Sequence, residues 1–296
     1  MKKKEVLIIG GSGFVGSHVA DKLYDNKYNV TIYDIKKSEW IKKKFKFIKG
    51  DIQNVKLVSK VIKQKDIVYN FAAIADLVEA QKNLEETYKI NFLSNIKILE
   101  LCKINKVKRY VFASTLYVFS NKGGFYRSSK EAAESFLIEY AKINKISYTI
   151  LRYGSLYGPR SDKDNNIYNI LNYALKNKKI IYQGNPESLR EYIHVEDAAR
   201  ISVDILKPEY KNKSLILSGI ENKKVSDLLN MIREILDLPK NSITFKNENY
   251  AGRYTYTPYS LKEDLAEKIV PKTHIDLGQG ILNTIKYIRS KKNNLT

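Results

Sequence analysis

The chain has 296 residues, of which 43% are hydrophobic and 11% aromatic, and its formal net charge is +20. This length and apolar content exclude a mostly disordered chain and allow one large domain or two interleaved ones. The single cysteine, Cys102, excludes a disulfide framework, and three scattered histidines leave no cluster for a histidine-held metal.

No segment reaches the roughly 18 consecutive apolar residues of a membrane-spanning helix, and no secretory signal pattern follows Met1. We therefore expect a soluble, cytoplasmic protein with no membrane partner. Basic residues are mixed with acidic ones along the chain, as at Lys130-Glu131. The charge thus predicts a solvated lysine surface that favours small anions such as nucleotides, and it does not predict a nucleic-acid partner.

The first half of the chain alternates short apolar segments with helical patterns. Strands are predicted at 5–9, 29–34, 45–48, 66–73, 109–114 and 148–151. Helices are predicted after residue 13, over about 80–105 and near 126–143. This alternation predicts parallel βαβ units and an α/β fold with a Rossmann-type doubly wound parallel sheet.

After Arg152 the rhythm changes, and Gly158-Pro159 indicates a turn. Helices are predicted near 167–178, 226–236 and 276–290, with short strands at 180–182, 192–195 and 215–217. We predict a dinucleotide-binding domain over 1–155, to which the chain returns at about 192–220. A smaller interleaved, mixed α/β substrate domain would consist of 156–191 and 221–296.

Three glycines follow the first strand and open the first helix. Gly10 permits a tight turn, Gly13 lets the backbone approach a pyrophosphate, and Gly16 allows close packing of helix on strand. The N-terminus of that helix would offer free N–H groups and a positive dipole end to the phosphates. The pattern predicts a dinucleotide cofactor.

Asp34 ends the second strand, where a carboxylate can accept hydrogen bonds from the adenosine ribose. An acidic side chain there repels a 2′-phosphate, so NAD is predicted over NADP, although Lys36 and Lys37 stand close behind. The alternative, in which Asp34 only ends a strand, stays open.

Further motifs follow in order along the chain. They are Gly50-Asp51-Ile52, Asn70-Phe71-Ala72-Ala73, Ser114-Thr115, Tyr126-Arg127-Ser128-Ser129-Lys130, Leu151-Arg152-Tyr153-Gly154, Tyr157-Gly158-Pro159-Arg160 and Arg190-Glu191-Tyr192-Ile193-His194-Val195-Glu196-Asp197. Together with the glycines, they make the whole chain resemble the extended short-chain dehydrogenase/reductase family, the sugar-nucleotide epimerases and dehydratases. The resemblance implies a nucleotide-sugar substrate and a homodimer formed through the helices near 80–105 and 126–143.

Tyr126 and Lys130 are four residues apart and therefore share a helix face. A lysine ammonium near the phenol is expected to lower the tyrosine pKa from about 10. Tyr126 would then take a proton from a sugar hydroxyl while the adjacent carbon gives its hydride to the nicotinamide. Thr115 is expected to hydrogen-bond the same oxygen; it stands four residues before Phe119, which matches a tyrosine of the family, and Ser114 is the alternative.

The resemblance also implies contacts to the cofactor and the substrate. The cofactor residues would be Phe14, Val15, Asp51, Ile52, Phe71, Ala72, Ala73, Asn91, Ser114, Tyr126, Lys130 and Tyr153. Within this set, Asp51 and Ile52 match adenine contacts, and Ala72 and Ala73 match a loop over the pyrophosphate. The substrate residues would be Thr115, Ser155, Arg190 and Arg253. A forked guanidinium such as that of Arg190 suits the substrate diphosphate.

The chain departs from the family at three points. The loop from Phe119 to Tyr126 is short, Ser155 stands where many relatives have asparagine, and Leu116 and Tyr117 replace the Asp-Glu pair of the related 4,6-dehydratases. Leucine cannot transfer a proton, so dehydration is disfavoured.

We therefore predict an NAD-dependent sugar-nucleotide epimerase, acting at C4 through a transient keto-sugar. The alternative is a reductase of a 4-keto-sugar nucleotide, which Asp34 argues against because such enzymes more often use NADPH. A non-catalytic dinucleotide-sensing or nucleic-acid-binding module is a third reading, and the complete Thr115, Tyr126 and Lys130 set argues against it.

Overall fold

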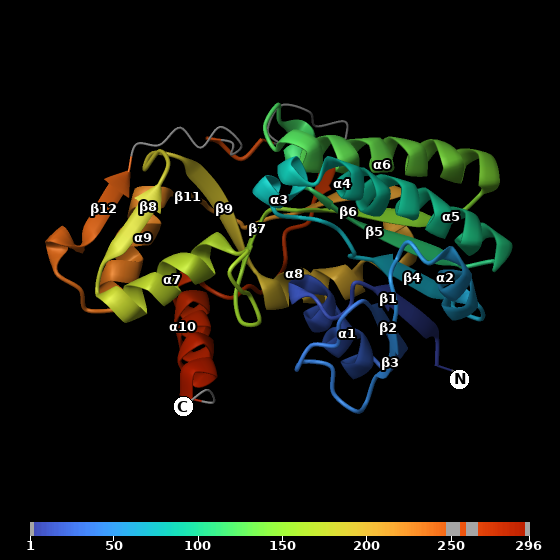
Figure 1. Ribbon diagram of the computed structural model, residues 1–296, viewed down its shortest axis with the longest axis horizontal. Helices are drawn as coiled ribbons and strands as arrows, with labels where there is room; N and C mark the ends of the chain where they lie inside the picture. The colour runs from blue at the N-terminus through green and yellow to red at the C-terminus, as the bar shows by residue number, and fades with distance from the viewer. Residues whose placement is uncertain (1–2, 247–254, 259–265, 294–296) are drawn as a thin grey trace.

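The computed structural model describes residues 3–246, 255–258 and 266–293 (Figure 1). The strands are β1 (Glu5–Ile9), β2 (Asn29–Asp34), β3 (Lys46–Lys49), β4 (Ile67–Asn70), β5 (Arg109–Thr115), β6 (Tyr148–Tyr153), β7 (Ser155–Tyr157), β8 (Ile180–Gln183), β9 (Leu189–His194), β10 (Lys213–Leu217), β11 (Asn222–Lys224), β12 (Ile243–Lys246) and β13 (Glu267–Lys268). The α-helices are α1 (Phe14–Asp25), α2 (Val55–Ile62), α3 (Leu77–Lys82), α4 (Leu84–Tyr88), α5 (Ser94–Ile104), α6 (Gly124–Asn144), α7 (Asn166–Asn177), α8 (Val195–Asp204), α9 (Val225–Ile235) and α10 (Leu277–Asn293).

The largest sheet has eight strands in the order β13-β10-β6-β5-β4-β1-β2-β3, and every neighbouring pair is parallel. The chain winds outward from β1 in both directions, so the topological switch point lies between β1 and β4. In such sheets the ligand crevice lies beyond the carboxyl ends of the strands at this point. The predicted Rossmann-type sheet is confirmed.

Helices cover both faces of this sheet, which is why its central strands are apolar throughout. Because side chains alternate along β1, Val6 and Ile8 enter the core beneath α1 and α8. Leu7 and Ile9 enter the opposite core beneath α2, α5 and α6. Figure 1 shows α5 and α6 along one side of the sheet, with α1 and α8 along the other.

A smaller unit, at the left of Figure 1, follows β6. It contains the sheet β11-β9-β7 and the strand pair β12-β8, and α7, α9 and α10 share a third apolar core with β8. The chain also returns to the main sheet, where β10 pairs with β6. The residue boundaries predicted for two domains remain a proposal.

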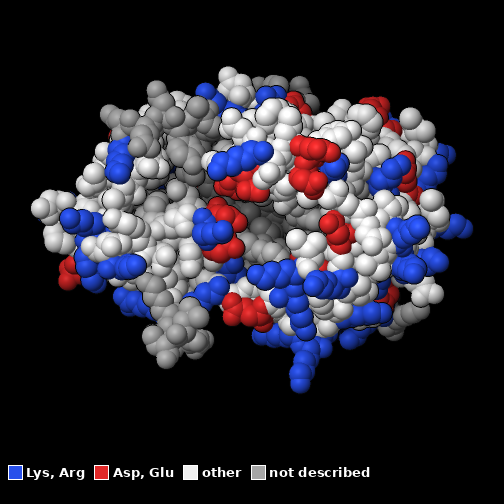
Figure 2. Space-filling view, in the orientation of Figure 1, with Lys and Arg blue, Asp and Glu red and all other residues white. Residues whose placement is uncertain are grey.

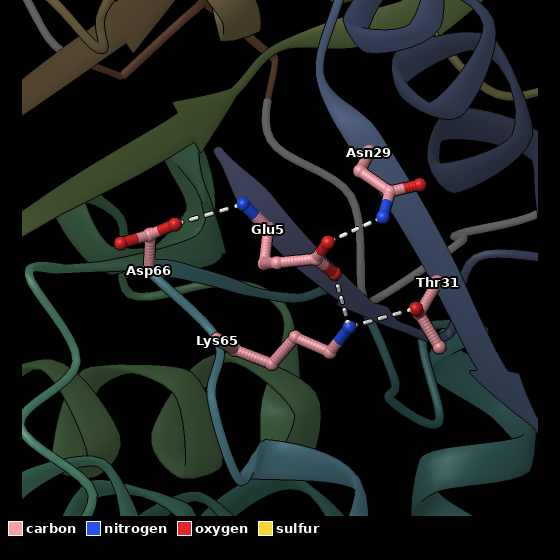
Figure 3. A network of polar contacts seen from close by, with 5 residues as sticks. All are labelled: Glu5, Asn29, Thr31, Lys65 and Asp66. Carbon is pink, nitrogen blue, oxygen red and sulfur yellow. Dashed lines mark hydrogen bonds and ion pairs between the residues drawn. The ribbon is translucent and has the colours of Figure 1, made fainter. Parts of the chain in front are cut away.

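At the end of the main sheet where its strands begin, here called the amino edge, charged and polar side chains form a network (Figure 3). Nζ of Lys65 donates to a carboxylate oxygen of Glu5 (2.8 Å) and to the hydroxyl of Thr31 (2.9 Å). The Asn29 amide donates to the other Glu5 oxygen, and the backbone N–H of Glu5 donates to Asp66 (2.8 Å). This network ties together the starts of β1, β2 and β4.

Several elements differ from their predicted positions. The single helix predicted over 80–105 is divided into α3, α4 and α5, because Asn83 interrupts it and a π-helical turn, Lys89–Leu93, joins α4 to α5. The fourth strand is four residues long and ends at Asn70, before the predicted end at 73. Helices α2 and α8 and strands β7, β11, β12 and β13 have no counterpart in the prediction.

Candidate active site

The glycine loop between β1 and α1 has the geometry that its three glycines imply. Gly10 has φ +76°, and a Cβ there would lie 2.5 Å from the backbone nitrogen of Ala72. A Cβ at Gly16 would lie 2.4 Å from the carbonyl oxygen of Gly10. A Cβ at Gly13 would meet only the Gly10 oxygen, at 3.5 Å, so the loop is closely packed at two glycines and open at the third.

The open position has the features of a phosphate cradle. Gly13 immediately precedes the first turn of α1, which Phe14 and Val15 begin, and this first turn carries no acidic residue. The hydroxyl of Ser12, which is 8% exposed, has no hydrogen-bond partner among the described residues. A buried donor without a partner beside a helix N-terminus fits a pyrophosphate.

Asp34 lies beside this loop, at the carboxyl end of β2. Its carboxylate accepts hydrogen bonds from the backbone N–H of Ser12 (2.9 Å) and of Lys36 (3.2 Å). Burial raises the pKa of Asp34, and these N–H groups offset part of the rise. Asp34 therefore orders the glycine loop itself, a contact that the sequence did not predict.

Residues 71–73 follow β4 and complete this side of the crevice. Phe71 stacks on Tyr69 with ring centroids 5.8 Å apart and lies 6.3 Å from the ring of Tyr153. Ala72 packs against Gly10, as described above, and Ala73 follows it, so the glycine loop and this segment lie together. Ile52, predicted as an adenine contact, is 7% exposed after β3.

The other predicted adenine contact, Asp51, is exposed. Its carboxylate accepts from the backbone N–H of Gln53 (2.8 Å), and its carbonyl oxygen accepts from the Tyr33 hydroxyl (2.6 Å). Neither contact joins Asp51 to another predicted site residue, so the adenine role of Asp51 stays a prediction.

Asn91 lies in the π-helical turn and connects two parts of the site. Its amide nitrogen donates to the carbonyl oxygen of Ile74 (3.0 Å) and to the Ser129 hydroxyl (3.0 Å), while its oxygen accepts from the Ile74 N–H (2.9 Å). The residue is 2% exposed. Asn91 thus holds the segment after β4 against the helix turn that carries Lys130.

Thr115 and Tyr126 are brought together as predicted. Thr115 ends β5, and its side chain hydrogen-bonds the Tyr126 phenol. Burial raises the Tyr126 pKa to about 12, and the hydrogen bond from Thr115 only partly opposes this rise. The expected lowering of the Tyr126 pKa is therefore wrong for this structure, because burial outweighs the hydrogen bond from Thr115.

Lys130 lies one helical turn after Tyr126 and is 2% exposed. Its Nζ donates to the carbonyl oxygen of Ala113 (2.9 Å) and lies 4.7 Å from the centre of the Phe112 ring. Burial lowers the pKa of Lys130 to about 8, against the opposing effect of the Glu134 carboxylate. Burial therefore disfavours the charged form of Lys130, which lies one helical turn after Tyr126.

Glu134, a further turn along α6, forms a buried ion pair with Arg152 of β6. The Arg152 guanidinium donates to both carboxylate oxygens, at 2.6 to 3.1 Å, and both side chains are at most 7% exposed. Arg152 stands in one of the sequence motifs, whereas no motif contains Glu134. The available signal was the position of Glu134, four residues after Lys130 and therefore on the same face of the helix.

A pocket of about 220 Å³ adjoins Thr115 and collects most of the predicted substrate residues. Its lining comes from the ends of β5 and β6, from β7 and β9, and from the N-terminal ends of α3 and α7. The lining includes Thr115, Tyr117, Tyr153, Ser155, Leu156, Arg190, Asp76, Asp164, Asn165, Tyr182 and Tyr192. Figure 2 shows a hollow near the centre of the face seen in Figure 1, with both blue and red side chains around it.

Three of the four predicted substrate residues therefore line the same pocket: Thr115, Ser155 and Arg190. Arg190 is 9% exposed on β9, and Ser155 starts β7, which pairs with β9. Arg253 lies outside the described residues. Sequence reasoning missed Tyr182, Tyr192, Asp76 and the start of α7, where the Asn165 side chain caps the helix by accepting from the Tyr168 N–H (3.1 Å). An asparagine before an apolar helical pattern was the signal for the last of these.

Ser114 and Tyr153 were predicted to contact the cofactor, and Tyr153 also lines this pocket. The Ser114 hydroxyl is buried and has no partner among the described residues, whereas the Tyr153 hydroxyl contacts the Ser202 hydroxyl at 2.7 Å. In the part of the chain that the structure describes, no group of three His, Cys, Asp or Glu side chains is arranged to hold a metal ion. No helix there is long and apolar enough to cross a membrane.

Comparisons with known proteins agree with this geometry. The sequence model of the NAD dependent epimerase/dehydratase family matches residues 6–215. The chain belongs to this family. The resemblance to extended short-chain dehydrogenases/reductases is confirmed, and the family's cofactor, NAD, fits the open glycine loop.

Three relatives illustrate the range of the family. A putative UDP-glucose 4-epimerase of Methanocaldococcus jannaschii is 29% identical over 98% of this chain and 100% of its own. A dTDP-D-glucose 4,6-dehydratase of Bos taurus is 24% identical over 98% of this chain and 90% of its own. The UDP-glucose 4-epimerase of Thermotoga maritima, solved with UDP-glucose, shares the fold with a TM-score of 0.83 at 22% identity, covering 97% and 99% of the two chains.

Proposed function

We propose that this family member is an NAD-dependent 4-epimerase of a UDP-sugar. The observation that carries the proposal is the joint placement of Thr115, Tyr126 and Lys130 between an open glycine loop and a pocket that contains Arg190. The relatives' names support UDP as the nucleotide and C4 as the reacting carbon.

In this proposal, Arg190 binds the substrate diphosphate and Thr115 orients the C4 hydroxyl against Tyr126. Tyr126 takes the hydroxyl proton as C4 is oxidised, and later returns a proton to the same oxygen. Bound NAD⁺ supplies the hydride acceptor and a positive charge that favours the phenolate. Lys130 adds a second positive charge near Tyr126, which compensates part of the cost of ionising a phenol whose pKa is about 12.

Because the hydride returns to C4 on the opposite face, the cycle consumes no external reductant. A cofactor that never leaves is consistent with the loop contacts of Asp34, which hold the cradle in place. The reductase alternative uses the same residues in one direction, and Asp34 disfavours the NADPH that such enzymes more often use.

The dehydratase relatives suggest another comparison. Elimination of water requires an acid and a base beside the sugar, and this chain places Leu116 and Tyr117 directly after Thr115. Leu116 is 1% exposed and buried in the core. The absence of a carboxylate at both positions favours epimerisation over dehydration.

We further propose that two copies associate through the face formed by α4, the π-helical turn, α5 and α6. This face exposes large apolar side chains, namely Leu84, Tyr88, Leu93, Ile104, Phe136 and Ile143, each 38% to 79% exposed. Large exposed apolar side chains on neighbouring helices favour an interface. We place the dimer in the cytoplasm, since the one cysteine of each chain is a free, buried thiol. The proposed UDP-sugar substrate places it in the biosynthesis of carbohydrates.

The purified protein, denatured without added cofactor, tests this proposal. We expect nearly one NAD released per chain, and interconversion of UDP-glucose and UDP-galactose by the native protein without added NAD. Tyr126→Phe should retain the NAD and lose the interconversion. An empty site that binds NADPH more tightly than NADH contradicts the proposal and supports the keto-sugar reductase.

A further inference from the structure

Tyr117 is a pocket-lining residue to which the proposed reaction assigns no role. It lies in the 3₁₀ turn Leu116–Phe119, two residues after Thr115. Its backbone N–H donates to the Thr115 hydroxyl oxygen (3.3 Å). The backbone of Tyr117 is therefore fixed to the residue that orients the sugar.

The ring of Tyr117 is fixed as well. It lies edge-on to the Tyr126 ring, with centroids 6.3 Å apart and an interplanar angle of 79°. On another side is Gly123, where a Cβ would come within 2.7 Å of the Tyr117 Cδ1. The loop between the 3₁₀ turn and α6 has only residues 120–123, so it holds the ring closely. If the C4 hydroxyl of a sugar reaches Tyr126, the two carbons bonded to C4, which are C3 and C5, are the ones that come nearest to this ring.

Two of the three charged side chains in the described lining of the pocket are carboxylates. The charged side chains in its described lining are Asp76, Asp164 and Arg190. Burial raises the pKa of Asp164, and the charges of Asp162 and Asp76 raise it further, which shows that Asp76 is close enough to act on it. Arg190 is assigned to the diphosphate, so no described cation in the lining is left for an acidic group on the sugar.

We propose that Tyr117 is the specificity-determining residue of the sugar pocket and selects uncharged sugars over hexuronic acids. The inference rests on the proposed function. Its physical basis is that Tyr117 presents a neutral ring to the substituent on C5. A hydroxymethyl group packs there at little cost, whereas a carboxylate loses its hydration and finds no compensating cation. Epimerases of this fold have been solved with either kind of sugar, so this choice is not fixed by the fold.

The test is a binding measurement on NAD-loaded protein that carries Tyr126→Phe, so that no turnover occurs. Calorimetry with UDP-glucose and with UDP-glucuronic acid compares two sugars that differ only at C6. We expect UDP-glucose to bind more tightly by a factor of about ten or more. Tyr117→Phe should keep this ratio, and Tyr117→Arg, which adds a cation, should reverse it.

Two glycines give a matched control for the position of the ring. Gly123 and Gly124 both have positive φ, at 96° and 51°, but a Cβ at Gly124 has nothing within 4 Å. Gly123→Ala should shift the ring and change the affinity ratio, whereas Gly124→Ala should leave it unchanged. Circular dichroism and melting confirm that each variant is folded.

The outcomes are distinguishable. If neither UDP-sugar binds, the proposed function is wrong. Equal affinity for the two sugars, or a ratio that Tyr117→Arg leaves unchanged in a folded protein, overturns the role of Tyr117 and leaves the proposed function standing. Should Tyr117→Arg fail to fold, Tyr117→Gln supplies a neutral donor instead, and we expect a partial loss of discrimination; an unchanged ratio again overturns the inference.

Discussion

The pKa values of titratable groups shift in opposite senses at the two ends of the main sheet: charged forms are favoured at the amino edge, where the strands begin, and disfavoured at the carboxyl edge, where they end. At the amino edge, Glu5 is desolvated, but hydrogen bonds from Lys65 and Asn29 outweigh this, so its pKa is lowered. Asp66 is paired with Lys108 (2.7 Å), and its pKa is lowered too. At the carboxyl edge, burial dominates: it raises the pKa of Tyr126 to about 12 and lowers that of Lys130 to about 8.

The difference separates a structural edge from a chemical one. Charged forms are favoured where partners are present, and the amino edge is stabilised by them. At the carboxyl edge both charged forms are disfavoured, so a charge brought there by substrate or cofactor changes the protonation equilibria strongly. Perturbed groups of this kind beside a pocket are what proton transfer requires.

The largest expected effect is on turnover, and it belongs to the carboxyl edge alone. Tyr126→Phe removes the group that transfers the proton, so kcat should fall by about 10² to 10⁴-fold. Lys65→Met, the matched change at the amino edge, should leave kcat within about twofold of the unchanged protein. Steady-state kinetics on both variants checks this, and equal losses in both would remove the functional distinction between the edges.

The next effect is on stability and concerns the ion pair behind the chemical edge. Glu134→Gln leaves the Arg152 guanidinium buried without its partner charge, and should lower the free energy of unfolding by about 3–5 kcal/mol. Replacing both residues with apolar ones, as in Glu134→Leu with Arg152→Met, should recover most of this loss. Denaturant unfolding measures both; a double variant as unstable as the single one would contradict the account.

Lys130 gives a smaller effect of opposite sign. Its folded pKa of about 8 lies below its ordinary value of 10.5, so the unfolded chain binds more protons between these values and stability rises with pH there. Below pH 8 the buried charge costs stability in full. Lys130→Met should therefore be more stable than the unchanged protein at pH 7, by about 1–3 kcal/mol, while losing activity.

Denaturant unfolding at a series of pH values tests that prediction. The stability difference between Lys130→Met and the unchanged protein should close as the pH rises from 8 to 10.5. A difference that does not vary with pH would show that Lys130 is not held in a lowered-pKa site.

The smallest effect is expected at the amino edge. Lys65→Met removes the partner of Glu5 and should cost about 0.5–1 kcal/mol at pH 7. The folded pKa of Glu5 is below its ordinary 4.5, so this contribution is present above pH 4.5 and disappears as the pH falls through the folded value. Unfolding measured from pH 7 down to the lowest pH at which the protein stays folded tests it, and a cost that does not fall with pH would point to lost packing and not to charge.

Much of the chemical edge could be predicted from the sequence because its signals are local. The glycines act within one turn between β1 and α1, and Tyr126 and Lys130 lie one helical turn apart. Thr115 was chosen over Ser114 because it stands four residues before Phe119, which matches a tyrosine of the family. The parallel pairing of the strands followed from their alternation with helices.

The electrostatics could not be predicted in the same way. The Tyr126 pKa depends on burial by elements that lie far apart in the chain, and Lys130 contacts Ala113 of β5. The pocket walls come from several elements that lie far apart in the chain, among them the start of α3, the end of β5, and β9. The break of the predicted long helix at Asn83 has no strong signal, because asparagine occurs within helices as well as at their ends.

A substrate labelled at the reacting carbon tests the central claim most directly. The protein as purified is given UDP-[4-²H]glucose without added cofactor, and the product is examined by mass spectrometry and NMR. The account predicts UDP-galactose that retains deuterium at C4, because the hydride leaves and returns within one site. Loss of the label from the product, or conversion only when NADPH is added, would contradict it.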